Sequence, residues 1–327
     1  MPNWNRCLVA ILIVNLFSTT ATADEATRAR FLAEYPAASR KIEATYRRLQ
    51  IVCELEHSNS ANPNNTVRGA HYRYMADGRK LRVDRQYSAD SGLYANQASS
   101  FVHNADKSFM VDRNEAASTY RVRSVGAGVE SFMSLAEVFP PAFTPYYVDE
   151  ERVVDLLAKR GFTVEDAVAE GTGEEESVLV RWNWPWEGTG PTMRKGEIRF
   201  LPGRGWALAS FHWRQRLQDK TWQIFESFAE VSYRGEFEGM PLVASVDKGL
   251  KMDDSSKLNF GIWRVTSIGP FATPEKEFTL AAFNLKYDQG IRSRNYGWYL
   301  ALIGAVGLVG SLAVRRWMNR RRVILTA

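Results

Sequence analysis

The alternation of apolar and polar positions predicts a chain built mainly from antiparallel strands. In residues 49–56 every second residue is apolar, Cys53 among them, which predicts a half-buried strand. The same alternation flanks Asp77-Gly78 in residues 70–87, and a two-residue turn of this type predicts a β-hairpin. The pattern returns at 100–113, 118–124, 162–169, 176–186, 194–201, 205–217, 221–234, 241–248 and 258–267.

Three segments have a helical period instead. Residues 25–48 predict a helix that Pro36 either starts or interrupts. Residues 130–139 place apolar side chains on one stripe and end at Pro140-Pro141. A further helix is predicted after Asp149, which caps it, with Gly161 as its C-terminal stop. The fold class is therefore α+β, a curved antiparallel β-sheet packed against helices.

The two ends of the chain have the patterns of a leader and a membrane anchor. Residues 1–23 combine Arg6, a short apolar run and an A-x-A ending, which predicts a signal peptide cleaved after Ala23. Residues 296–314 contain no charged side chain and are long enough for one transmembrane helix. Five arginines follow in the tail, 315–327, so the C-terminus is predicted to be cytoplasmic and the domain at 24–269 exported. Residues 270–295 lose periodicity and are predicted to form a stalk.

Charge and cysteine content support this placement. The chain has 42 basic and 37 acidic residues, but six of the arginines lie in the predicted leader and tail. The exported part is thus close to neutral, and nucleic acid is excluded as a partner. Cys53 is the one cysteine outside the leader, so no intramolecular disulfide forms, which favours a bacterial envelope protein in the inner membrane over a eukaryotic surface protein.

The stretch VLVRWNWPWEGTGP, residues 178–191, brings three tryptophans together. Trp182 and Trp184 share the apolar face of the predicted strand, whereas Trp186 follows Pro185 in the turn. Core packing is the leading interpretation, and the lining of an apolar ligand cavity or a surface sugar platform are the alternatives. The candidate ligand-binding residues are Trp182, Trp184, Trp186, Trp206 and Trp213.

No catalytic signature is present in the sequence. The four histidines, His57, His71, His103 and His212, are scattered, so neither a metal site nor a cofactor is predicted. Ser245 and Lys248 match S-x-x-K, but the companion motifs of that chemistry are missing. An enzyme is therefore not the leading hypothesis.

A leading helix, a meander broken by helices, and the phrases KGEIRFLPGRGWALASFHWR and FESFAEVSYRGEFEGMPLVASV resemble the LolA/LolB-type (RseB-like) half-barrel of bacterial periplasmic proteins. The resemblance covers about residues 30–250 and consists of a pattern of strands and turns. It implies a hollow that holds lipid or acyl chains, and no catalysis.

The resulting hypothesis is a membrane-anchored extracytoplasmic binding or sensing module for a lipid, an acyl chain or an envelope protein partner. A structural envelope protein without a small ligand, and an envelope enzyme whose site is not visible in the sequence, are the alternatives.

Overall fold

The computed structural model describes residues 23–59, 69–91, 95–104, 107–113, 119–126, 139–149, 151–185, 193–216, 224–252, 258–272 and 275–285. All but the last of these residues belong to one compact unit, Met1–Asn284. The predicted signal peptide (except Ala23), transmembrane helix, basic tail and Trp186 lie outside the described residues and stay predictions. Within the described ranges, no helix combines the length and the apolar composition needed to cross a membrane.

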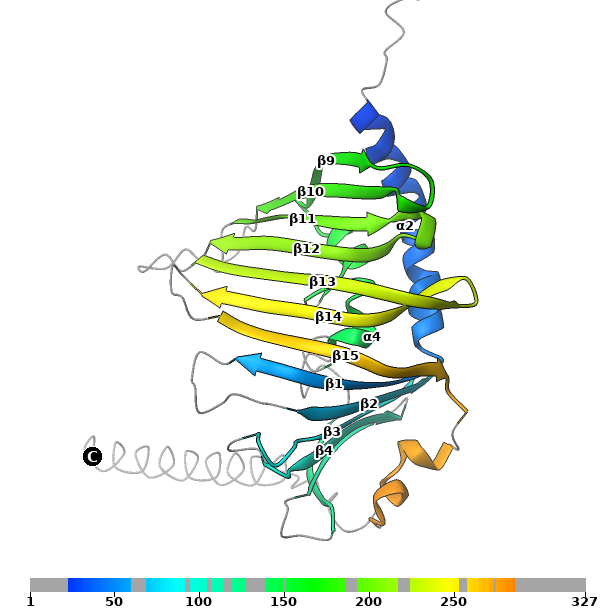
Figure 1. Ribbon diagram of the computed structural model, residues 1–327, viewed down its shortest axis with the longest axis vertical. Helices are drawn as coiled ribbons and strands as arrows, with labels where there is room; N and C mark the ends of the chain where they lie inside the picture. Colours follow the sequence, from blue (N-terminus) through cyan, green and yellow to red (C-terminus); the bar gives the residue numbers. More distant parts are fainter. Residues whose placement is uncertain are drawn as a thin grey trace, which may run out of the picture. The chain divides into compact units, whose positions relative to one another are not determined.

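Thirteen of the described strands form one large open antiparallel sheet with a few helices against it (Figure 1). Its order is β6-β5-β4-β3-β2-β1-β15-β14-β13-β12-β11-β10-β9, so only the β1–β15 pairing joins segments distant in sequence. The strands are β1 (Leu49–Asn59), β2 (Ala70–Asp77), β3 (Lys80–Gln86), β4 (Ala98–Asn104), β5 (Ser108–Arg113), β6 (Arg121–Gly126), β9 (Thr163–Glu170), β10 (Ser177–Pro185), β11 (Met193–Leu201), β12 (Ala207–Arg216), β13 (Ile224–Phe237), β14 (Met240–Met252) and β15 (Leu258–Pro270).

Two buried clusters lie beneath the same helix. Helix α2 (Ala23–Tyr46) runs across the strands and contacts both β9 and β14 (Figure 1). Its C-terminal half packs into the first core, which includes Ile42, Tyr46, Cys53, Tyr72, Tyr74, Phe139, Phe143 and Tyr146. Its N-terminal half packs into the second core, which includes Phe31, Tyr35, Trp182, Trp184, Phe200 and Trp206. One helix thus ties the two parts of the sheet together.

The alternation predicted most strands to within a few residues. Cys53 is fully buried, as predicted, because it pairs with Tyr72 and Val265 on the helix-covered face. Arg82, expected on the polar face of its strand, is buried as well. Its guanidinium lies between Asp84 and Glu277 and over the ring of Phe283. The buried positive charge is therefore paired with two carboxylates.

Several local predictions need correction. The hairpin turn consists of Gly78 and Arg79 and not of Asp77-Gly78, since Asp77 still pairs with Lys80. Gly78 has φ +61°, which a glycine adopts without strain. Pro36 neither starts nor interrupts α2. Pro140 begins a short helix, α4 (Pro140–Phe143), because a proline lacks only an N–H that the first turn leaves unpaired.

The predicted stalk is in part a packed element. β15 extends to Pro270, and two 3₁₀ turns, η6 (Glu275–Phe278) and η7 (Leu280–Phe283), follow it. Phe278, Leu280 and Phe283 are buried, and η6 contacts β3 and β4. This segment therefore belongs to the folded domain as far as residue 284.

Candidate functional site

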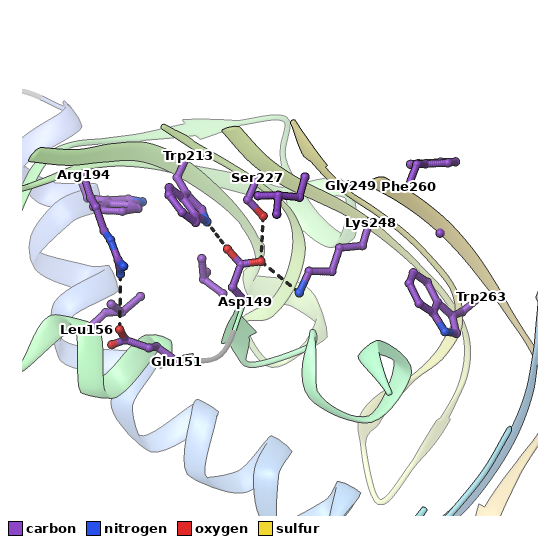
Figure 2. A pocket seen from close by; sticks show the side chains of 14 residues that line it. Asp149, Glu151, Leu156, Arg194, Trp213, Ser227, Lys248, Gly249, Phe260 and Trp263 are labelled. Carbon is purple, nitrogen blue, oxygen red and sulfur yellow. Dashed lines mark hydrogen bonds and ion pairs between the residues drawn. The ribbon is translucent and has the colours of Figure 1, made fainter. Parts of the chain in front are cut away.

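A hollow lies between the sheet and the segment that leads into helix α5 (Val153–Leu157). Its volume is about 420 Å³, and we call it the tryptophan groove (Figure 2). Its walls come from six adjacent strands, β10 to β15, and from Val148, Asp149, Glu151 and Leu156. Because neighbouring strands lie about 4.8 Å apart, a groove that crosses six of them is about 24 Å long.

Three indoles form much of the sheet side of the groove: Trp182, Trp213 and Trp263. Glycines let two of these tryptophans approach the backbone closely, Trp213 through its Cβ and Trp263 through its ring. Gly196 pairs with Trp213, and a Cβ at Gly196 would lie 2.5 Å from the Cβ of Trp213. A Cβ at Gly261 would overlap the ring of Trp263, two residues along the same strand. The hollow therefore depends on two positions without side chains.

Asp149 lies on the opposite wall of the groove and contacts three polar groups of the sheet. Its carboxylate accepts hydrogen bonds from Trp213 Nε1 and from Ser227 Oγ, the latter at 2.8 Å, and pairs with Lys248 Nζ at 3.1 Å (Figure 2). The backbone at Asp149 has φ +52°, a conformation that aspartate tolerates better than most residues. The predicted capping role is wrong. Arg152 is the N-cap of α5, no side chain caps it, and Asp149 contacts the sheet instead.

A second set of charges holds the next residues of this segment. Strands β7 (Tyr147–Val148) and β8 (Glu151–Arg152) form a small hairpin. Glu151 pairs with Lys159 and, at 3.6 Å, with Arg194 of β11. The Arg194 guanidinium also lies 5.4 Å from the ring centres of both Trp184 and Trp213. The hairpin is thus held over the sheet by ion pairs, not by an apolar contact alone.

Two indole donors in the walls have no partner among the described residues. Trp182 Nε1 and Trp263 Nε1 are buried, and neither donates a hydrogen bond there. The Trp182 ring stacks on Phe162 at 5.3 Å, which fixes its plane. An unpaired buried donor costs free energy, so these two positions are where an acceptor atom would be stabilising.

The five candidate tryptophans divide between groove and core. Trp182 and Trp213 line the groove. Trp184 is buried beside it, with Nε1 donating to the Arg160 carbonyl at 3.2 Å and Lys159 over its ring. Trp206, at φ +63°, lies in the second core and donates to Glu34 at 3.0 Å. The burial of Trp182 and Trp184 confirms that they belong to the sheet interior, while ligand binding by any of the five stays a prediction.

The prediction missed the other groove residues. Trp263 could have been found, because it lies in a predicted strand with alternating apolar positions. Asp149 and Lys248 could not, because only the fold brings them together. The S-x-x-K match does not form a pair. Ser245 Oγ lies 2.7 Å from Ser232 Oγ, whereas Lys248 contacts Asp149. Within the described ranges, no three His, Cys, Asp or Glu side chains are grouped as a metal site would require.

No protein-family model and no curated protein matches the chain. Among solved structures, LprF from Mycobacterium bovis is similar at 8% sequence identity, over 73% of this chain and 96% of that one, with a TM-score of 0.27. Overlap at this level establishes neither a shared fold nor a shared function.

Proposed function

We propose that this chain is a binding module that holds an elongated apolar ligand, a lipid or an acyl chain, in the tryptophan groove. The observation that carries the proposal is a continuous hollow of about 420 Å³ that crosses six strands and is lined by indole rings. Its volume lies within the range of about 300–1,000 Å³ that is usual for ligand sites. Its length favours a chain-like ligand over a compact one.

The charges of the groove support an apolar ligand. Each cation that lines it already contacts an acid of the hairpin, Lys248 with Asp149 and Arg194 with Glu151. Separating either pair to bind a charged ligand leaves a poorly solvated charge behind. A hydrocarbon chain carries no charge and can lie in the groove without separating either ion pair.

The setting of this module is part of the proposal and rests on the sequence. The signal peptide at 1–23, the transmembrane helix at 296–314 and the arginine-rich tail favour a single-pass protein with its folded domain outside the cytoplasm. A LolA/LolB-type half-barrel would be the fold in which such a groove lies. We propose that the membrane itself is the source of the ligand.

The test begins with the full chain purified in a nonionic detergent. We expect organic extraction and mass spectrometry to recover a lipid or fatty acid at a fixed ratio to protein, and a fluorescent fatty acid to displace it. Gly261→Ala should weaken fatty-acid binding by about tenfold, because the added methyl drives the Trp263 ring from its place.

Gly269→Ala is the matched control. It adds the same methyl to the same strand, β15, at a position outside the groove where a Cβ would meet no heavy atom within 4 Å. If both glycine variants lose binding equally, the loss comes from damage to the sheet. If the native chain carries no lipid and shows no saturable fatty-acid binding, the proposal is wrong and a structural role is favoured.

A further inference from the structure

A second hollow lies on the sheet near its β6 edge, and four arginines surround it. Its volume is about 620 Å³. Arg85, Arg113, Arg121 and Arg123 line it together with one acid, Asp112. We call it the arginine groove. It shares no lining residue with the tryptophan groove, so it does not depend on the function proposed above.

The strand register explains why Arg85, Arg121 and Arg123 gather around Asp112, while Arg113 follows Asp112 at the end of β5 and pairs with Ala98. Arg85 of β3 lies opposite Ser99 of β4, Ser99 opposite Asp112 of β5, and Asp112 opposite Arg121 of β6. Residues directly opposite one another share a face of an antiparallel sheet. Arg123 lies two residues beyond Arg121 and therefore points to the same side. These paired residues form a row across the sheet. The row begins at Arg85, which pairs with the buried Tyr72, and its side chains toward the β6 edge are polar.

Elsewhere in the sheet, arginines of this kind have a close acid on the neighbouring strand. Arg73 pairs with Asp84 at 2.8 Å, and Arg181 pairs with Asp166 at 2.7 Å. In the arginine groove, Asp112 is the only lining carboxylate among the described residues, and its one ion pair there is with Arg123, at 3.5 Å. Four guanidinium groups therefore share one carboxylate.

Two of the four arginines are held in place by aromatic rings and a hydroxyl. Arg85 lies 4.8 Å from the ring centre of Tyr87 and donates from Nε to Ser99 Oγ at 3.3 Å. Arg113 lies 5.3 Å from the ring centre of Tyr120. Stacking leaves the edges of a guanidinium group free to donate, and it reduces the conformational freedom lost when an anion binds.

We propose that the arginine groove binds a phosphate-bearing anionic ligand. The planar guanidinium fork matches the geometry of phosphate oxygens and binds them through two parallel hydrogen bonds. The alternative explanation is that charged side chains on an edge strand prevent sheets from pairing with one another. That explanation accounts for Arg121 and Arg123 on β6, but not for Arg85 and Arg113, which lie on inner strands.

The experiment uses the full chain in nonionic detergent and two probes. Calorimetric titration with inorganic pyrophosphate tests for a free phosphate ligand. Mixed micelles that contain phosphatidylglycerol, compared with phosphatidylcholine, test for a lipid headgroup. The test variant is Arg121→Gln/Arg123→Gln, since both side chains are exposed at the edge. The control is Arg28→Gln/Arg40→Gln, which removes two exposed arginines from helix α2.

We expect at least one probe to bind, with an affinity that falls as salt is added and drops about tenfold in the β6 variant but not in the α2 control. Binding of pyrophosphate alone identifies a free phosphate ligand, and preference for phosphatidylglycerol micelles identifies a headgroup. The proposal is overturned if neither probe binds the native chain. It is also overturned if the β6 variant binds like the control. Aggregation of the β6 variant with unchanged affinity would likewise overturn it, since the arginines would then only protect the sheet edge.

Discussion

The sheet is rich in aromatic residues on both sides of its middle, yet the first core beneath α4 is filled, whereas the surface over β10 to β15 holds the tryptophan groove. In the first core, Phe139 and Phe143 lie on the tyrosines of β2, with Phe139 stacked on Tyr74 at 5.5 Å. Over β10 to β15, the hairpin and α5 contact the sheet through the ion pairs of Asp149 and Glu151 as well as through buried apolar side chains. The aromatic rings of α4 fill the space between α4 and the sheet. The ion pairs instead keep the hairpin away from the sheet backbone by the combined length of two side chains.

The same contrast is visible in the polar atoms of the aromatic rings. Tyr46 OH, in the first core, donates to the Pro241 carbonyl at 3.0 Å and accepts from Val243 N at 3.1 Å. Around the tryptophan groove, the Nε1 atoms of Trp182 and Trp263 have no partner in the described chain. In the first core the buried hydroxyl of Tyr46 is satisfied, whereas two indole donors beside the groove are not.

Phe139→Ala is expected to have the largest effect, because it removes the ring that fills the first core. Phe139 has no exposed surface and stacks on Tyr74. The truncation should lower the free energy of unfolding by about 3–5 kcal/mol, measured by denaturant titration of the full chain in detergent. Fatty-acid binding by the molecules that remain folded should not change.

Trp263→Ala is the counterpart at the tryptophan groove, at the place where the groove borders the first core. The ring is half-buried and borders the groove, so its loss should cost less stability, about 1–2 kcal/mol, while fatty-acid affinity changes. If Phe139→Ala proves the milder of the two variants, the first core is not the filled one and the comparison fails.

Lys248→Met should have an intermediate effect, since it removes one of the charges that hold the hairpin. The side chains of Lys248 and Asp149 are 13% and 20% exposed, so the pair is partly shielded from water. Methionine keeps the length of the side chain but leaves Asp149 with only Trp213 and Ser227. We expect a loss of about 2 kcal/mol and faster release of a bound fluorescent fatty acid.

Lys195→Met, at an exposed position of β11, is the control for this experiment. It should change neither stability nor release by a measurable amount. Unchanged release from Lys248→Met would mean that the hairpin does not limit access to the groove.

The parts of the fold that follow from local pattern could be predicted from the sequence. Trp182 and Trp184 alternate with polar residues, and both proved buried. The missed features depend on contacts between distant residues. Asp149 has the local context of a helix cap, and only the folded chain brings Ser227 to it, 78 positions away. Arg82 is buried because Glu277, 195 positions away, covers it. Because Ser227 and Glu277 are distant in sequence, the local pattern around Asp149 and Arg82 gives no indication of these contacts.

Cys53 gives the smallest expected effect and the sharpest check that the first core is filled. Its side chain has no exposed surface, and burial raises the pKa of the thiol above its ordinary value. In the unfolded chain the thiol ionises near pH 8.5, whereas in the folded chain it stays protonated. The stability that this group contributes is therefore complete below about pH 8.5 and is lost as the pH rises above it.

Cys53→Ala should lower the free energy of unfolding by about 1 kcal/mol at neutral pH, because it removes one buried sulfur atom. Between about pH 8 and 10 its stability should fall less steeply than that of the native chain, since the variant has no thiol there to ionise. A thiol reagent should label the native chain only after denaturant is added. Rapid labelling without denaturant would show that water reaches Cys53, and the first core would then be no more closed than the groove beside it.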